Sequence, residues 1–298
     1  MEITQIIASH IGEVTGEDFT VTGQHSIAGG CINSAFKLQG KGKDYFVKTN
    51  SASRLPMFEA EYAGLKEIAD SASIRVPLPL CFGTAGRQAY LVMEYIVAGS
   101  HRVSASDKSM QQFGQQLAAM HQHTSDGFGW HMHNTIGSTE QRNSRSRDWL
   151  EFWRTQRLGF QLQLAAGNGY AGSLQTEGER LMSALSSLFD DYRPEASLLH
   201  GDLWSGNVIV DSDAQPVIYD PAVYYGDREA DIAMTELFGG FSRRFYSAYQ
   251  EAWPLSDGYP IRRDVYNLYH VLNHLNLFGG GYLGQASNLM GNILSQIR

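Results

Sequence analysis

The sequence predicts an α+β fold of two lobes, a small β-rich N-terminal lobe over residues 1–97 and a larger, mainly helical C-terminal lobe over residues 98–298. Two observations lead to this prediction. Alternating apolar residues and glycine-containing turns fill much of the first part of the chain, whereas apolar residues at helical spacing dominate the rest. A β-rich region followed by a helix-rich region favours two lobes with a cleft between them, where ligands tend to bind.

In the N-terminal lobe, isoleucines at helical spacing predict a helix over residues 2–14. Pro56 precedes a second helical pattern over 57–70, as expected because proline is tolerated in the first turn of a helix. Gly99 and Ser100 are the expected hinge between the lobes. The expected strands cover residues 19–27, 32–38, 44–48, 80–83 and 90–95.

In the C-terminal lobe, the only strand-like segments are two short apolar runs, Val208-Ile-Val210 and Val217-Ile-Tyr219. Residues 124–147 are polar and contain glycine, so they form a long loop in this prediction, and loops of that length are often functional. The expected helices cover residues 104–123, 148–166, 175–190, 229–250 and 262–278.

Composition excludes several classes of protein. The net charge of −8 argues against nucleic-acid binding, because phosphate contacts need a basic surface. Two cysteines, Cys31 and Cys81, supply neither a disulfide framework nor a cysteine-type zinc site. No signal peptide and no apolar run long enough to span a membrane is evident, so the expected location is the cytoplasm. His121 and His123 are two residues apart on an expected helix, and side chains at that spacing do not chelate a metal together.

One stretch carries the strongest chemical signal: Leu198-Leu-His-Gly-Asp-Leu-Trp-Ser-Gly-Asn207, followed by Ile218-Tyr-Asp-Pro-Ala222. Phosphoryl transfer from ATP needs a carboxylate beside the acceptor hydroxyl, and an amide and a second carboxylate that hold Mg²⁺ against the phosphates. Asp202, Asn207 and Asp220 occur in that order, between strand-like runs. Ordinary turn chemistry explains each residue alone but not the combination. The stretch therefore predicts a small-molecule kinase with Asp202 as the base and Asn207 and Asp220 as metal ligands.

The N-terminal lobe offers partners for the nucleotide phosphates. Gly29 and Gly30 lie between the first two expected strands, where glycines allow backbone amides to approach phosphate, although a plain hairpin turn also uses them. Alternation along the strand places Lys48 on the same face as Phe46, so we expect it to point inward, where an ammonium needs a partner. Glu61, unlike Glu59, lies on the apolar face of the following helix, so Glu61 is the expected partner.

The remaining candidates concern adenine and the acceptor. Residues 91–96 form an apolar strand that leads into the hinge, and the backbone of Glu94 and Ile96 is suited to bind adenine. Trp204 offers a flat apolar face to a sugar ring, or else is a core aromatic. Glu229 lies in an acidic segment. This segment either attracts a substrate amine or simply stabilises the positive end of a helix dipole.

These motifs together resemble the fructosamine kinase, or ketosamine-3-kinase, family within the aminoglycoside-phosphotransferase-like, protein-kinase-like enzymes. The resemblance runs nearly end to end. Trp204 after His-Gly-Asp-Leu and Asp-Pro-Ala at residues 220–222 are its most specific features. The other matching segments are Phe46-Val-Lys48, Met57-Phe-Glu-Ala-Glu61, Val92-Met-Glu94, Asn134-Thr-Ile-Gly-Ser138, Leu237-Phe-Gly-Gly-Phe241 and Asn273-His-Leu-Asn-Leu-Phe-Gly279.

The resemblance implies a two-lobed protein-kinase-like fold and ATP- and Mg²⁺-dependent phosphorylation of the 3-hydroxyl of ketosamines, which are sugars joined to an amine by glycation. It implies that Asp202 is the base, that Lys48 with Glu61 positions the ATP phosphates and that Trp204 lies under the sugar. The implied partner is a small ketosamine or a glycated amine, and neither a nucleic acid nor a membrane. Another hydroxyl kinase, acting on an aminoglycoside, amino alcohol or sugar, and a nucleotide-binding pseudokinase remain alternatives.

Overall fold

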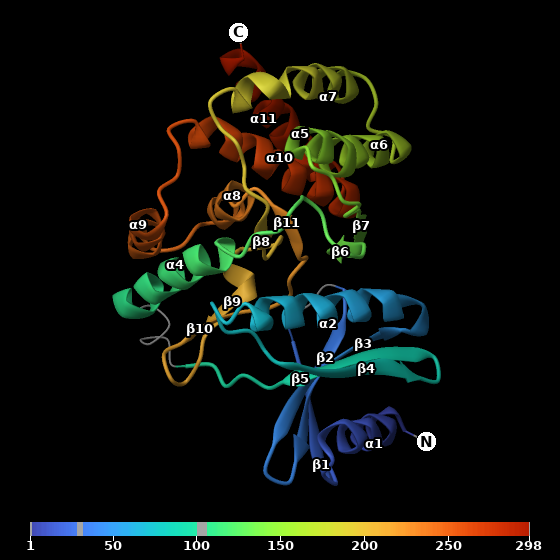
Figure 1. Ribbon diagram of the computed structural model, residues 1–298. Helices are drawn as coiled ribbons and strands as arrows, with labels where there is room; N and C mark the ends of the chain where they lie inside the picture. The colour runs from blue at the N-terminus through green and yellow to red at the C-terminus, as the bar shows by residue number, and fades with distance from the viewer. Residues whose placement is uncertain (1, 29–31, 100–105, 298) are drawn as a thin grey trace. The chain divides into compact units, whose positions relative to one another are not determined.

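The structure is a computed structural model that describes residues 2–28, 32–99 and 106–297. It divides into two compact units, shown in Figure 1. The first comprises Met1–Ser109 and Val208–Pro221, and the second comprises Met110–Asn207 and Ala222–Arg298. The units therefore differ from the two continuous ranges that the sequence predicts. The expected hinge residue Ser100 and the phosphate-loop residues Gly29 and Gly30 lie outside the described residues.

The first unit is built on one antiparallel sheet of five strands in the order β1-β2-β3-β5-β4. Its strands are β1 (Val21–Ile27), β2 (Ser34–Gly40), β3 (Asp44–Ser51), β4 (Pro79–Ala85) and β5 (Gln88–Glu94). Its helices are α1 (Ile3–Thr15), η1 (Ala52–Arg54) and α2 (Leu55–Asp70). All five expected strands and both expected helices are confirmed, with ends that move by a few residues.

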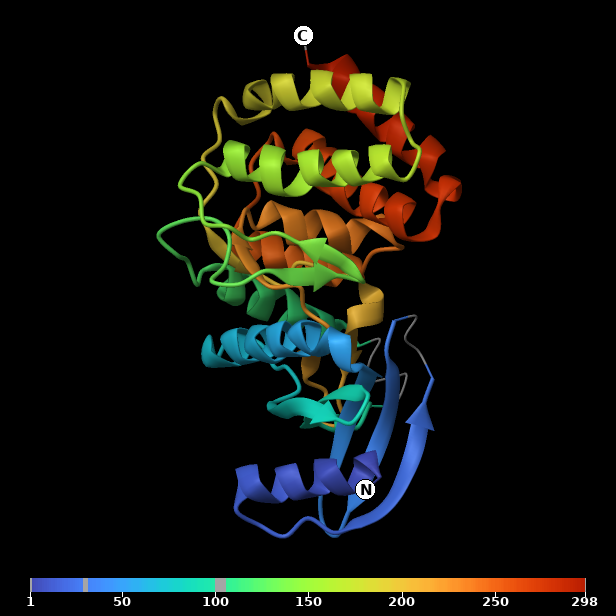
Figure 2. The same cartoon turned by 90° about the vertical axis from the view of Figure 1, so that its right-hand side faces the viewer.

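The two faces of this sheet have different helices. Tyr45 and Val47 of β3 belong to the apolar core that also contains Ile7 and Ile11 of α1. Because side chains alternate along a strand, Lys48 points to the other face, where it meets α2. Figures 1 and 2 show α1 and α2 on opposite sides of the sheet. The inward direction of Lys48 therefore follows from the pleat of β3.

A hairpin from late in the chain completes the first unit. It consists of β9 (Val208–Val210) and β10 (Pro216–Ile218). The backbone amide of Gly99 donates to Val210 O at 2.8 Å, and the amide of Ile218 donates to Arg75 O at 3.0 Å. Arg75 also forms an ion pair with Asp211, which is buried. These contacts explain why residues 208–221 group with the N-terminal strands, which no local pattern in the sequence indicates.

The second unit is mainly helical, with short strand pairs β6–β7 and β8–β11. Figure 2 shows α7, α6 and the β6–β7 hairpin in successive levels. The helical elements are α4 (Asp107–His121), α5 (Trp149–Phe152), the π-helical η2 (Trp153–Leu158), α6 (Gly159–Gly167), α7 (Ser173–Ala184), η3 (Leu185–Phe189), η4 (Ser205–Asn207), α8 (Glu229–Leu237), α9 (Arg243–Ala252), α10 (Tyr259–Phe278), η5 (Gly280–Tyr282) and α11 (Leu283–Gln296). The strands are β6 (Asn134–Ile136), β7 (Thr139–Gln141), β8 (Ser197–Leu199) and β11 (Tyr224–Gly226).

Three sequence predictions for this unit were wrong. The expected helix over 229–250 is two helices, because Gly239 and Gly240 adopt φ values of 97° and 72° that a helix does not allow. The expected loop over 124–147 contains the β6–β7 hairpin, and α11 was not predicted. Within the described residues, no helix is long and apolar enough to cross a membrane.

The buried side chain of His270 is expected to make the free energy of unfolding depend on pH. Burial, together with nearby His274, lowers the pKa of His270 from 6.5 to about 3. Between these values the unfolded chain binds a proton that the native state does not. Stability is therefore lost as pH falls from 6.5 towards 3, by up to about 5 kcal/mol from this residue. We expect His270→Gln to flatten the dependence when urea unfolding is measured from pH 4 to 7. His123→Gln, at an exposed histidine, is the control, and an unchanged slope in His270→Gln contradicts the assignment.

Candidate active site

Lys48 lies at the centre of a charged cluster in the first unit. Its Nζ is 2.5 Å from Glu61 Oε1 and 2.5 Å from Asp220 Oδ1. The lysine and glutamate side chains are only 7% and 10% exposed, whereas that of Asp220 is 44% exposed. The expected Lys48–Glu61 ion pair is confirmed. Glu59 is exposed on the same helix, as its position outside the apolar face of α2 predicts.

The charges of this cluster keep the lysine ionised. Burial lowers the pKa of Lys48, but the charges of Asp220 and Glu61 outweigh burial and raise the pKa above its ordinary value. Burial raises the pKa of Glu61, against the effect of Lys48. A buried cation between two carboxylates is pre-organised to exchange one of them for a phosphate oxygen. The partly exposed Asp220 is the carboxylate better placed for such an exchange.

Asp220 has an unusual backbone conformation. Its φ of +56° lies in the left-handed region, which residues other than glycine seldom adopt, although aspartate adopts it more often than most. Such conformations cost free energy and are found most often at functional sites. Pro221 follows Asp220 directly and restricts the local chain further. The sequence indicated the carboxylate but not its strained backbone.

An apolar cavity of about 410 Å³ lies beside this cluster, within the first unit. Glu94 and Ile96 line it, as the sequence predicts for an adenine slot. The amide of Glu94 donates to Leu78 O at 2.9 Å and is therefore already occupied. The other lining residues are Ile27, Ala28, Ile32, Asn33, Ala35, Phe46, Lys48, Pro77, Met93, Tyr95, Ile209, Tyr219 and Asp220.

In the second unit, Asp231 of α8 holds the loop that contains Asp202. Its Oδ2 accepts a hydrogen bond from the His200 amide at 2.7 Å, and its Oδ1 accepts one from the Gly201 amide at 2.8 Å. His121 Nε2 lies 3.2 Å from the same Oδ2. Asp231 is 1% exposed, and the sequence analysis did not identify it. The available signal was a second carboxylate in the first turn of α8, two residues after Glu229.

The protonation states in this cluster follow from its hydrogen bonds. Burial raises the pKa of Asp231, but its hydrogen bonds with His121 and the Gly201 amide favour the charged carboxylate, and the pKa is lowered. Burial lowers the pKa of His121, which is therefore neutral and donates from Nε2. Its Nδ1 then accepts from the Tyr249 hydroxyl at 2.8 Å. His121 is a structural partner of Asp231, consistent with its exclusion as a metal ligand.

Asp202 and Asn207 lie on this held loop and contact each other. Asn207 Nδ2 donates to the Asp202 backbone carbonyl at 2.8 Å and approaches Asp202 Oδ2 at 3.4 Å. The amide of Asp202 donates to His200 Nδ1 at 3.2 Å. Gly201 has a φ of +82°, and a Cβ there would lie 2.1 Å from Ala222 O, so only glycine fits. Because Asn207 uses its nitrogen on the loop, its Oδ1 is the atom suited to a cation.

Trp204 follows Asp202 closely and is 37% exposed. Its ring extends over Gly206, where a Cβ would come within 2.3 Å of the indole. On another side it makes an edge contact with Phe238, with ring centroids 6.2 Å apart. An exposed indole beside the expected base favours contact with a substrate over a role in the core.

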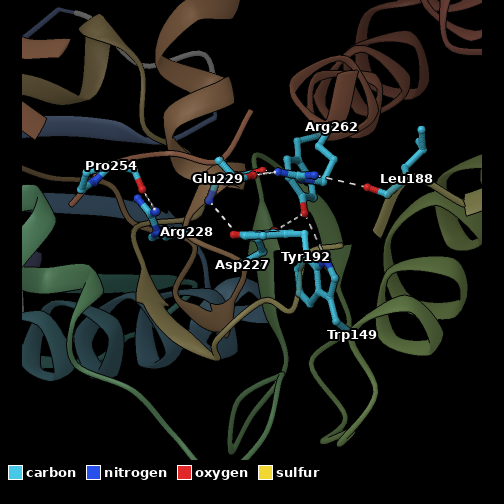
Figure 3. A network of polar contacts seen from close by, with 10 residues as sticks. Trp149, Leu188, Tyr192, Asp227, Arg228, Glu229, Pro254 and Arg262 are labelled. Carbon is cyan, nitrogen blue, oxygen red and sulfur yellow. Dashed lines mark hydrogen bonds and ion pairs between the residues drawn. The ribbon is translucent and has the colours of Figure 1, made fainter. Parts of the chain in front are cut away.

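Glu229 does not have the role that the sequence suggested. Its side chain is fully buried, and both carboxylate oxygens bind Arg262, at 2.7 and 2.9 Å. Figure 3 shows this pair beside Asp227, which accepts hydrogen bonds from Tyr192 and the Glu229 amide. The expectation that Glu229 meets a substrate amine is therefore wrong, because the carboxylate is buried and neutralised by an internal partner.

Glu229→Gln is expected to destabilise the fold. Burial raises the pKa of Glu229 to about 7, so above that pH the carboxylate is charged and balances Arg262. Removing one partner of a buried pair leaves the other charge unbalanced, at a cost of about 3–5 kcal/mol. Urea unfolding at pH 8 measures the change. Glu140→Gln, in the exposed pair with Arg142, is the matched control and should cost under about 1 kcal/mol. Equal losses in the two variants contradict the prediction.

The oxygen donors among the candidate residues are of the type that binds magnesium together with a substrate, not of the type that forms a metal site from protein ligands alone. Among residues 2–28, 32–99 and 106–297, no group of three or more His, Cys, Asp or Glu side chains is placed to hold a metal. Mg²⁺ is usually bound by one or two protein oxygens together with substrate phosphates and water. Asn207 Oδ1 and the Asp220 carboxylate are oxygen donors of that kind. Each of these donors, taken by itself, is therefore of the type that binds a magnesium ion arriving with a nucleotide.

Comparisons with known sequences agree with these features. A family model described as fructosamine kinase matches residues 3–296. A Synechocystis protein named as a ketoamine kinase is 43% identical, over 97% of this chain and 96% of its own. An Oryza sativa protein named protein-ribulosamine 3-kinase is also 43% identical, over 95% of this chain and 82% of its own.

Solved structures show the same fold. A Haemophilus somnus structure described as a fructosamine-3-kinase has a TM-score of 0.87 at 28% identity, over 97% of this chain and 96% of its own. An aminoglycoside phosphotransferase has a TM-score of 0.61 at 16% identity, over 98% of each chain. The fold class that the sequence predicts, an α+β protein-kinase-like fold, is confirmed.

Proposed function

Since the chain belongs to the fructosamine kinase family, we propose that it transfers the γ-phosphoryl group of ATP to the 3-hydroxyl of a ketosamine. The observation that supports this most is the position of Lys48 between Glu61 and Asp220. This is the arrangement by which kinase-like enzymes position nucleotide phosphates. Relatives named for ketoamines and ribulosamines support the choice of acceptor.

The first unit supplies the groups for the nucleotide. The apolar cavity accepts adenine, with the Glu94 carbonyl and the Ile96 amide as its hydrogen-bonding partners. The Lys48 ammonium binds the phosphates and is directed by Glu61. Gly29 and Gly30 cover the phosphates through their backbone amides in this proposal. When bound, Mg²⁺ neutralises phosphate charge, and Asn207 and Asp220 would hold it.

The second unit supplies the groups for the acceptor. The Asp202 carboxylate accepts a hydrogen bond from the 3-hydroxyl and orients its oxygen towards the γ-phosphorus. As the new P–O bond forms, the bond to the β-phosphate oxygen breaks, ADP leaves and the hydroxyl proton passes to Asp202. Trp204 packs against the C–H face of the sugar. The phosphorylated ketosamine then releases its amine, so the activity repairs glycation, and the cytoplasm is the expected place.

ADP release by the purified protein tests the proposal. Fructoselysine, ribuloselysine and an aminoglycoside are compared as acceptors, with ATP and Mg²⁺ and with EDTA as the metal-free control. Turnover of a ketosamine that EDTA abolishes supports the proposal, and phosphorus NMR of the product identifies the acceptor oxygen. Turnover of the aminoglycoside alone identifies another hydroxyl kinase. Nucleotide binding without turnover of any acceptor indicates a pseudokinase.

A further inference from the structure

A row of aromatic side chains continues from Trp204 across the second unit. The Trp204 ring contacts Phe238 at 6.2 Å between centroids, and Phe238 contacts His274 at 4.9 Å. His274 lies 5.5 Å from Phe278 and 5.1 Å from Tyr282. The row begins and ends with exposed rings, since Trp204 is 37% and Phe278 is 59% exposed. Phe278 is too exposed for a role in the core, so its ring is available to a ligand.

The segment that supplies the outer rings of this row has no charged side chains. Residues 265–297, which include His274, Phe278 and Tyr282, contain no Lys, Arg, Asp or Glu. His274 Nδ1 lies 2.8 Å from the His270 carbonyl, which only accepts, so Nδ1 carries the hydrogen. Burial lowers the pKa of His274, and its ring is therefore neutral near pH 7. A cation placed over the outer rings of the row meets π-faces and no formal charge from residues 265–297.

The substrate chemistry supplies such a cation. The nitrogen of a ketosamine is an amine attached to the sugar, and a secondary alkylamine is protonated near neutral pH. Glu229, the carboxylate that the sequence offered for this charge, is buried against Arg262. Ring faces attract ammonium groups, and the attraction is stronger when the site is partly desolvated. The row starts at Trp204, two residues after the proposed base, so it extends from the position proposed for the sugar.

We infer that the aromatic row of Phe238, His274, Phe278 and Tyr282 receives the protonated amine of the ketosamine and the side chain attached to it. This inference rests on the proposed function and specifies which part of the substrate each group of the enzyme recognises. The sugar ring is recognised at Trp204, and the amine is recognised by π-faces instead of a carboxylate. Ketosugars without a cationic nitrogen are consequently poor substrates.

Phe278→Leu tests the row, because leucine keeps an apolar side chain but has no π-face. The substrates are ribuloselysine and the same compound acetylated on the ketosamine nitrogen, which removes the charge. We expect kcat/KM for ribuloselysine to fall about 5- to 30-fold, mainly through KM, with less than a twofold change for the acetylated compound. Phe278→Tyr should restore the preference, and KM for ATP should stay constant.

Phe160→Leu is the matched control. Phe160 belongs to α6, packs on Arg142 and lies outside the row. Equal losses for both compounds in Phe278→Leu mean that the ring only packs, and no loss means that the amine lies elsewhere; either result overturns the inference. Calorimetric titration of ribuloselysine into wild-type and variant protein gives the same comparison without turnover. Weaker binding by the variant then supports the row even if no ketosamine is phosphorylated, whereas equal binding overturns it.

Discussion

Asp202→Asn is expected to lower kcat by about 10²- to 10⁴-fold, the usual contribution of a positioned proton acceptor. Asparagine has nearly the same shape but cannot accept the hydroxyl proton. The hydrogen bonds that shape the loop use the Asp202 amide and carbonyl, at 3.2 and 2.8 Å, and these remain in the variant. The effect should therefore appear in kcat, with KM for ATP and the thermal midpoint near their wild-type values.

Single-turnover phosphorylation of a ketosamine measures this effect directly, because it separates chemistry from product release. Asp257→Asn, at an exposed aspartate of the same unit, is the matched control and should be fully active. A variant that retains more than about a tenth of the wild-type rate contradicts a role for Asp202 as the proton acceptor.

Asp231→Asn is expected to have the second largest effect, although Asp231 is only a positioning residue. Its carboxylate accepts from the His200 amide, the Gly201 amide and His121 Nε2. An asparagine presents one oxygen and one NH₂ group, so at least one of these donors faces another donor. Leaving a buried donor unsatisfied costs about 1–3 kcal/mol. Because Asp202 directly follows Gly201, we also expect kcat to fall by about 10- to 100-fold.

Two measurements separate stability from positioning in this variant. Urea unfolding gives the loss of stability, and kcat is determined at a temperature where the variant is fully folded. Asp148→Asn is the matched control, since Asp148 also accepts two backbone amides, from Leu150 and Glu151, at the exposed start of α5. Asparagine is an equally good cap there, so little change is expected. A destabilised Asp231 variant with normal kcat would show that Asp231 supports the fold alone.

The parts of the site that the sequence predicted are those fixed by short-range periodicity. The alternation of β3 gives the direction of Lys48, and the apolar face of α2 selects Glu61 over Glu59. The parts that it missed depend on partners far along the chain. Glu229 is paired with Arg262 and Asp231 with the loop at residues 200–201, and no spacing rule connects these positions.

The same distinction holds for the fold. The strands of the first unit and the long helix α10 were predicted, because each has its own repeating apolar pattern. The β6–β7 hairpin was not, because its strands are three residues long and their buried polar residues resemble a loop. The break after α8 was missed because Gly239 and Gly240 lie inside an otherwise continuous helical pattern.

The hairpin of residues 208–221 also affects the order in which the protein matures on the ribosome. Lys48 and Arg75 are synthesised long before Asp220 and Asp211, the carboxylates with which they pair. The sheet of the first unit is therefore synthesised while Lys48 and Arg75 still lack these carboxylates. More than half of the second unit is synthesised before Asp211 and Asp220. An N-terminal fragment that ends at Ser109 lacks both carboxylates, so these two ion pairs cannot form in it.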